Sequence, residues 1–101
     1  MRIYKYPLAI TDVRDGVFTG TIQMPLNANI IKVGMQGTVI TLWAMFEDVA
    51  WDSSPTEPRS FLAVGTGRDF YDGEANNGKG LEYLDSVFDR DYVWHVFEQT
   101  T

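Results

Sequence analysis

The stretch NIIKVGMQGTVITLWAMF, residues 29–46, decides the fold of this 101-residue chain. Two runs rich in β-branched residues flank Gln36-Gly37, a dipeptide suited to a tight turn, so the pattern predicts a β-hairpin with strands over 29–35 and 38–46. The second strand is apolar on both faces around Leu42-Trp43-Ala44, which is typical of a central, covered strand. A helix over 42–49 is the alternative, but no capping residue precedes it. The strand is therefore favoured.

Outward from this hairpin, short apolar runs alternate with turn residues and no repeat is found. Asp15-Gly16 favours a turn, and residues 12–16 have turn chemistry throughout. The fold class that we expect is all-β: a small antiparallel sandwich or a partly open barrel of about seven short strands. One short helix has room in the loop after residue 47 or after Gly80. The whole chain, 1–101, forms a single domain, and the remaining strands are predicted over 2–8, 17–24, 59–64, 81–87 and 92–98.

Two segments read as connections. Residues 47–59 hold two Pro, two Ser and four acidic residues, so they predict a surface loop. Trp51 lies inside it, either folded back over the core or exposed as a contact residue. Residues 69–80 hold three Gly and two Asn without periodicity, which predicts a flexible segment that would serve as a lid if it closed over a site.

The net charge and the Cys and His counts argue against several classes of function. Eight Lys and Arg face fourteen Asp and Glu, a net charge of −6, which argues against broad nucleic-acid binding and against an anionic membrane surface. The absence of Cys excludes thiolate metal sites and a Cys nucleophile, and a single His excludes His-rich metal sites. No apolar run has the length of a membrane span and no signal peptide is found, so a cytoplasmic location is expected.

The turn Gly65-Thr66-Gly67-Arg68 is the first candidate site. Backbone N–H groups in such a turn can hold an anion, and the Arg68 guanidinium would add a fork for phosphate or carboxylate. The alternative is a turn that ends a strand and needs Gly for its backbone angles. The four-residue pattern is not a P-loop or a dinucleotide-binding fingerprint.

The remaining candidates are aromatic or ionisable. His95, the single His, is a core or interface residue more often than a base, and no motif supplies it with a nucleophile. The acidic groups around Asp48 and Asp72 lack the EF-hand pattern and are interpreted as solvated loops. A narrow aromatic pocket for one small anion remains open, with Arg59 or Arg68 at its mouth. Candidate ligand-binding residues are therefore Trp43, Arg59, Gly65, Thr66, Gly67, Arg68, Trp94 and His95, with no catalytic residue, metal or cofactor expected.

Four motifs stand in order along the chain: Tyr-Lys-Tyr-Pro-Leu at 4–8, Leu-Trp-Ala at 42–44, Gly-Thr-Gly at 65–67 and Val-Trp-His-Val-Phe-Glu at 93–98. With these the chain resembles a family of small uncharacterised accessory proteins from tailed phages and prophages. Residues 69–80 look like an insertion relative to that family. The resemblance implies a phage accessory protein and carries over no catalytic residue.

Two functions follow as expectations. The first is a non-enzymatic counter-defence protein that sequesters a small anionic, nucleotide-derived host immune signal in the pocket of a homo-oligomer, in the host cytoplasm. The second is an acidic module that binds and inhibits a host defence enzyme, where its surface would mimic nucleic acid or dock on a basic groove. Oligomers are expected because strand edges favour pairing and because a chain this small offers a shallow pocket alone.

Overall fold

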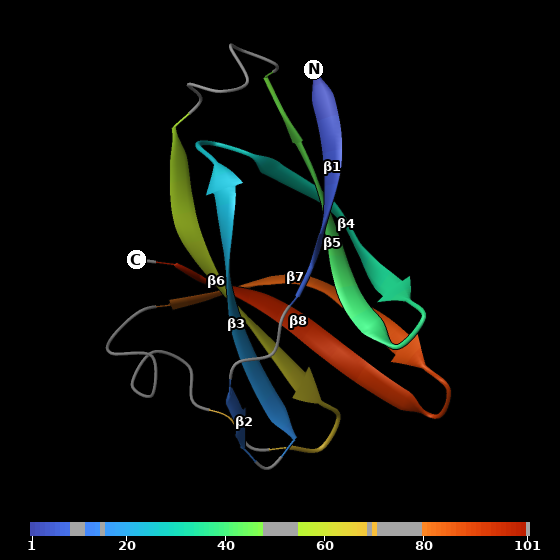
Figure 1. Ribbon diagram of the computed structural model, residues 1–101. Helices are drawn as coiled ribbons and strands as arrows, with labels where there is room; N and C mark the ends of the chain where they lie inside the picture. Colours follow the sequence, from blue (N-terminus) through green and yellow to red (C-terminus); the bar gives the residue numbers. More distant parts are fainter. Residues whose placement is uncertain (9–11, 15, 48–54, 69, 71–79, 101) are drawn as a thin grey trace.

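The computed structural model describes residues 1–8, 12–14, 16–47, 55–68, 70 and 80–100, with 12–14 described by their backbone alone. Trp51 and most of the predicted 69–80 segment lie outside these residues, so neither prediction is addressed. The described residues form eight strands and no helix. They therefore contain no helix that is long and apolar enough to cross a membrane. The strands (Figure 1) are β1 (Arg2–Pro7), β2 (Asp12–Arg14), β3 (Val17–Pro25), β4 (Asn29–Gln36), β5 (Val39–Phe46), β6 (Thr56–Gly65), β7 (Gly80–Asp89) and β8 (Tyr92–Thr100).

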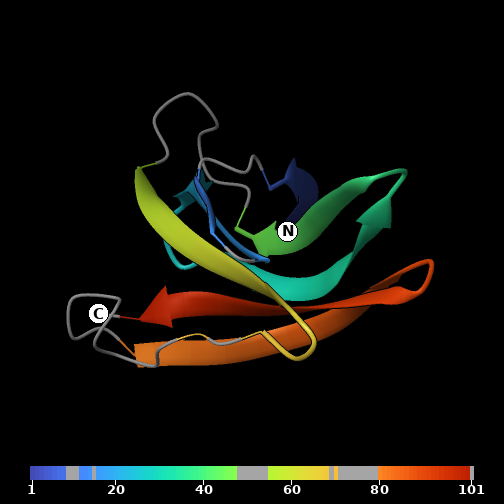
Figure 2. The same ribbon diagram turned by 90° about the horizontal axis from the view of Figure 1, so that it is seen from below.

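The strands form two antiparallel sheets that face each other. The three-stranded sheet has the order β1-β5-β4 and the five-stranded sheet the order β2-β3-β6-β8-β7. Figure 2 shows β7 and β8 as a layer beneath β4 and β5, with the turns of both hairpins at the same end of the molecule. The predicted all-β class is confirmed as an open sandwich rather than a closed barrel, and the short helix is not found in the described residues.

The hairpin predicted around Gln36-Gly37 is confirmed. Gln36 pairs with Val39, and Gly37 adopts φ = 61°, which favours Gly because it has no Cβ. β5 is the central strand of its sheet, as its apolar sequence predicts. Leu42 and Ala44 are fully buried between the sheets, so Thr41 and Trp43, one position along, lie on the outer face.

The core lies between the two sheets. The apolar side chains of β5 meet those of β3, β6, β7 and β8, and the largest fully buried residue is Phe61. Tyr4, Tyr6 and Trp94 pack against this core from its margins. The buried core residues are Leu8, Met24, Ala28, Val33, Ile40, Leu42, Ala44, Phe46, Phe61, Ala63, Val87 and Val96.

Two predicted boundaries are wrong. Residues 12–16 hold a three-residue strand, β2, that pairs with the start of β3. The predicted 47–59 loop ends early, because β6 begins at Thr56 and Pro58 pairs opposite Gln23. A strand tolerates Pro where one edge has no neighbour, and β8 pairs with β6 only from Phe61 onward.

Candidate functional site

The eight candidate residues fall in three places. Six of them meet where β6 ends beside β8, since Gly65 pairs with Trp94 and Val64 with His95. Arg59 lies near the other end of β6, and Trp43 lies on the other sheet. The six that meet are Gly65, Thr66, Gly67, Arg68, Trp94 and His95.

Three of the four backbone N–H groups of the Gly65–Arg68 turn donate hydrogen bonds to backbone carbonyls. Gly65 N–H donates to the Gly16 carbonyl (3.0 Å), Thr66 N–H to the Val93 carbonyl (3.2 Å) and Arg68 N–H to the Gly65 carbonyl (3.1 Å). Gly67 adopts φ = 83°. The alternative interpretation, a strand-ending turn that needs Gly, accounts for these contacts without a bound anion.

His95 links that turn to the β7–β8 hairpin. Its Nε2 lies 2.7 Å from the Thr66 hydroxyl, and its Nδ1 lies 2.7 Å from the Ser86 hydroxyl. The Ser86 hydroxyl in turn lies 2.6 Å from that of Tyr83. A neutral imidazole donates at one nitrogen and accepts at the other, so both hydrogen bonds are satisfied at once. The network fixes the ring and joins β8 to β7 and to the turn that follows β6.

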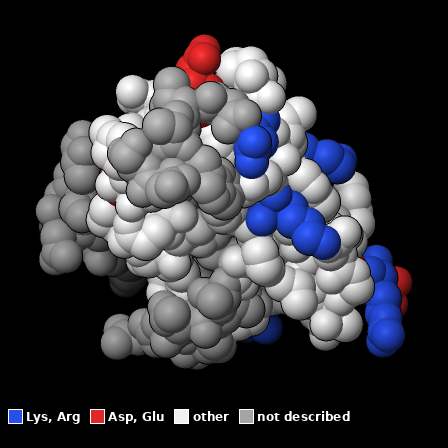
Figure 3. All heavy atoms as spheres, turned by 45° about the horizontal axis from the view of Figure 1, so that its top comes forward, with Lys and Arg blue, Asp and Glu red and all other residues white. Residues whose placement is uncertain are grey.

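The two candidate Trp residues play different parts. Trp94 packs against Phe18, with ring centroids 4.7 Å apart, and stacks with Tyr92 at 6.4 Å. It belongs to the margin of the core. Trp43 lies partly exposed on the outer face of the three-stranded sheet, opposite Lys5 on one side and Lys32 on the other. Figure 3 shows Lys and Arg side chains gathered on one side of the molecule, over a surface that is otherwise mostly white.

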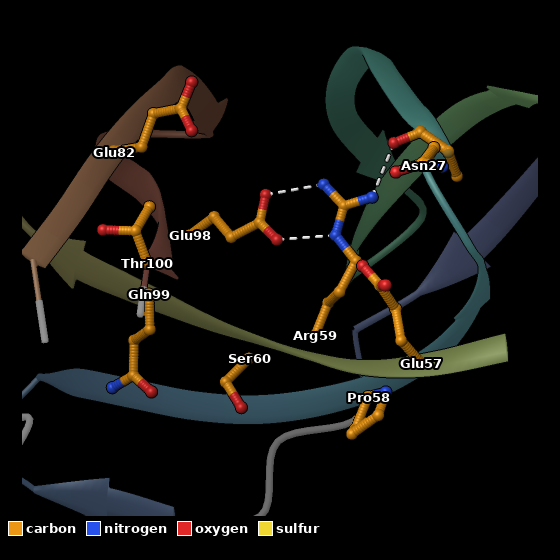
Figure 4. Close-up of a pocket in the computed structure, with 10 residues that line it drawn as sticks. Asn27, Glu57, Pro58, Arg59, Ser60, Glu82, Glu98, Gln99 and Thr100 are labelled. Atoms are coloured by element: carbon orange, nitrogen blue, oxygen red, sulfur yellow. Dashed lines mark hydrogen bonds and ion pairs between the residues drawn. The ribbon is translucent and has the colours of Figure 1, made fainter.

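Arg59 is held by β8 and by the chain before β4. Its Nε and Nη2 donate to the two carboxylate oxygens of Glu98 at 2.6 and 2.7 Å, and its Nη1 donates to the Ala28 carbonyl at 2.6 Å (Figure 4). The hydrogen bonds to Glu98 raise the pKa of the guanidinium, against the opposite effect of burial. Arg59 therefore has an internal anion as its partner.

An open hollow of about 450 Å³ surrounds this ion pair. Figure 4 shows its polar lining, which includes the carboxylates of Glu57, Glu82 and Glu98 and the guanidinium of Arg59. Its formal charge is negative, so it does not suit a small anion. Among the described residues, these carboxylates included, no three His, Cys, Asp or Glu side chains are placed so that they could hold a metal ion together.

The β7–β8 hairpin carries a surface that sequence reasoning missed. Phe88 and Tyr92, either side of its turn, are 74% and 68% exposed, and Tyr83 is 55% exposed. Residues 80–100 hold five carboxylates and one Arg, which gives a net charge of −4 with His95 neutral. We call the side chains of Phe88, Asp91 and Tyr92, which are exposed, and of Asp89, which is half-buried, the acidic aromatic tip. The sequence signal that could have revealed this surface is the pair Val87-Phe88, because neighbouring residues of a strand point to opposite faces and one of two adjacent apolar side chains is then exposed.

The architecture defines a small all-β sandwich domain with an exposed aromatic hairpin. The chain belongs to the family DUF7352, described as a domain of unknown function, which matches residues 1–101. No curated protein and no solved structure matches the chain.

Proposed function

We propose that this protein is a non-enzymatic binding module that docks its acidic aromatic tip on a basic surface of a partner protein. The exposure of Phe88 and Tyr92 at one hairpin turn carries the proposal. Large exposed aromatics are the side chains that anchor protein interfaces, because they bury much area and lose little conformational entropy. Phe88 pairs with Val93 and Tyr92 with Asp89, so the two rings point to opposite faces at the end of the hairpin, and a partner that binds both would enclose the turn.

The hairpin supports these side chains rigidly. β7 pairs with β8 from Gly80↔Thr100 to Asp89↔Tyr92, with one irregularity between Tyr83 and Asp85. Trp94 anchors β8 to Phe18 of β3, and His95 anchors it to Thr66. A preorganised surface loses less entropy on binding than a loop that must order first.

Charge favours a basic partner. Asp89 and Asp91 lie on either side of Arg90 at the turn, next to Phe88 and Tyr92. Carboxylates at the rim of an interface mainly raise the association rate and exclude acidic competitors. With the phage resemblance of the sequence, the partner class that we propose is a host defence enzyme with a groove for a polyanion, met in the host cytoplasm.

Capture of a small anion, the first expectation from the sequence, has less support. Arg59 is paired with Glu98, the hollow around it is lined by carboxylates, and three N–H groups of the Gly65–Arg68 turn already donate to carbonyls of Gly16, Val93 and Gly65. Native mass spectrometry of the protein purified from host cells separates the two functions. A discrete oligomer that carries a nucleotide-sized mass would support capture and contradict docking.

The direct test compares two double variants. Tagged protein with Phe88→Ala and Tyr92→Ala loses the tip, and a protein with Ile31→Ala and Val39→Ala loses two exposed apolar residues of the other sheet. A partner identified from host lysate is purified and titrated against each. We expect the tip variant to bind at least tenfold more weakly and the control to bind like the parent, with affinity that falls as salt rises. Equal binding by the tip variant would overturn the proposal.

A further inference from the structure

The charges of this acidic protein are segregated between its two sheets. The strands β1, β4 and β5 contain Arg2, Lys5 and Lys32 and no Asp or Glu. Glu47 follows directly after β5, beside the end of the strand that holds Arg2. The described carboxylates of β6, β7 and β8 belong to the opposite sheet. Lys5 and Lys32 share the outer face with Trp43, whereas Arg2 lies against Tyr4 on the opposite face of β1. The outer face of β1-β5-β4 therefore has two cations although the chain has a net charge of −6.

Trp43 lies at the centre of this face, between two ammonium groups. Lys5 pairs with Trp43 from β1, and Lys32 pairs with it from β4. A Cβ added to Gly34 would lie 3.6 Å from Cζ3 of Trp43 and 3.7 Å from Cε of Lys32. The indole of Trp43 and the aliphatic part of Lys32 thus both pack over Gly34, because this residue has no side chain that would displace them.

Trp43 is partly exposed, and Lys5 and Ile3 of β1 lie beside it on the same face. The Lys5 ammonium donates to the Gln36 side-chain oxygen at 2.7 Å, across Thr41, which explains why Thr41 is only 1% exposed. An ammonium has three donors, so Lys5 keeps further donors for an anion. Ile3, on the same face of β1 as Lys5, is 52% exposed and extends the apolar surface around Trp43.

We propose that the outer face of β1-β5-β4 binds a short segment of single-stranded nucleic acid, with one base stacked on Trp43 and the flanking phosphates at Lys5 and Lys32. Neighbouring strands lie about 4.8 Å apart, so the Cα atoms of Lys5 and Lys32 are about 10 Å apart across β5. Two flexible ammonium groups at that spacing reach the backbone on both sides of one stacked base. A cationic surface with an aromatic stacking platform is the general form of a single-strand site.

The net charge does not prevent this binding. The Debye length is about 8 Å at physiological ionic strength. The two sheets of a sandwich are about 10 Å apart, so the carboxylates of the opposite sheet are largely screened from a ligand on the outer face. The sequence-level exclusion of nucleic acid rests on the sum of the charges and does not include their placement. A duplex is disfavoured because its stacked bases present no face to Trp43.

The test uses a fluorescein-labelled oligothymidylate and fluorescence anisotropy from low to physiological salt. We expect Trp43→Ala to weaken binding about tenfold or more and Trp43→Phe to retain most of it. Lys5→Gln with Lys32→Gln should flatten the dependence of log K on log salt by about 0.7 for each phosphate that is no longer neutralised. Arg90→Gln is the matched control: it removes one positive charge from the hairpin turn of the other sheet and should leave binding unchanged.

Three results would overturn the proposal: equal binding by Trp43→Ala and the parent, equal weakening by Arg90→Gln, or competition by duplex DNA or a polyglutamate peptide as strong as by unlabelled oligothymidylate. The last would assign the face to duplexes or to acidic proteins. Circular dichroism verifies that Trp43→Ala is folded, and the Lys pair and Trp43→Phe decide the question if it is not. The Phe88→Ala/Tyr92→Ala protein should bind oligothymidylate normally, so this proposal and the docking function can fail separately.

Discussion

Arg59 and Glu98 join β6 to β8 by two parallel hydrogen bonds beyond the point where the backbones of these strands pair. Their backbone pairing ends at Phe61↔Glu98, and Arg59 lies two residues past it. Both side chains are mostly buried, 15% and 13% exposed. The guanidinium also holds the Ala28 carbonyl, so a single side chain connects β6, β8 and the turn before β4.

Arg59→Met should therefore destabilise the protein. It removes the partner of a mostly buried carboxylate and leaves the Ala28 carbonyl without its donor, so we expect a loss of about 2–3 kcal/mol in the free energy of unfolding. Arg59→Lys should restore little, because an ammonium cannot form the bidentate pair. Urea denaturation measures both. Losses under about 0.5 kcal/mol would show that water replaces these interactions without cost.

Removal of a tip aromatic should have little effect on stability. Phe88 is largely in solvent, so Phe88→Ala should change the free energy of unfolding by no more than about 0.5 kcal/mol. Phe61→Ala, at the centre of the core, should cost about 3–5 kcal/mol. Thermal melts of both variants give the comparison. A large loss with Phe88→Ala would mean that this ring stabilises the hairpin and is not a free anchor.

The Arg68 side chain fills the space that a side chain at position 16 would occupy. Gly16 adopts φ = 79°, and an added Cβ would lie 2.8 Å from Nε of Arg68. Gly16→Ala should cost about 1–2 kcal/mol from its backbone angle, plus the displacement of Arg68. Gly37→Ala, at φ = 61° with open space around it, is the control for the backbone contribution alone.

A double-mutant cycle with Arg68→Ala isolates the interaction between Gly16 and Arg68. We expect Gly16→Ala to cost less in the Arg68→Ala background than in the parent. Equal costs in the two backgrounds would show that the Arg68 side chain moves aside freely. The single variant Arg68→Ala also tests the prediction that the Gly65–Arg68 turn binds an anion, because it removes the guanidinium and leaves the backbone of the turn intact.

The fold was more predictable than the site. The pattern of residues 29–46 determined a hairpin and a central strand, because alternation and a tight turn are local properties of the sequence. The start of β6 was missed because Pro58 is a turn signal by itself, and only its unpaired edge makes it acceptable in a strand. β2 was missed because three residues are too few to show a period.

The candidate site was predictable only where neighbours in sequence are neighbours in space. Thr66 and His95 were both chosen as candidates, but their hydrogen bond depends on the register of β6 against β8. Arg59 was expected at a pocket mouth, and Glu98, which occupies it, lies thirty-nine residues away. The cationic face around Trp43 was hidden by the net charge, because a sum over the chain contains no information about which sheet each charge belongs to.

Ionisation of Tyr6 should lower the stability of the folded protein at alkaline pH. Burial, and then the nearby Tyr4, raise the pKa of Tyr6 above its usual value of 10.0. The neutral phenol is therefore favoured in the folded state, and the folded protein binds this proton more tightly than the unfolded chain. The stabilisation is fully present below pH 10.0 and is lost as the pH rises through the folded pKa of Tyr6.

Urea denaturation across this alkaline range measures the effect. The free energy of unfolding should be flat with respect to Tyr6 at neutral pH and should fall above pH 10.0, and Tyr6→Phe should reduce the slope of that fall. Tyr92→Phe is the control, because the Tyr92 side chain is 68% exposed and lies on the other sheet. An identical alkaline slope in Tyr6→Phe and the parent would place the sensitivity elsewhere and show that ionised Tyr6 is tolerated where it packs against the core.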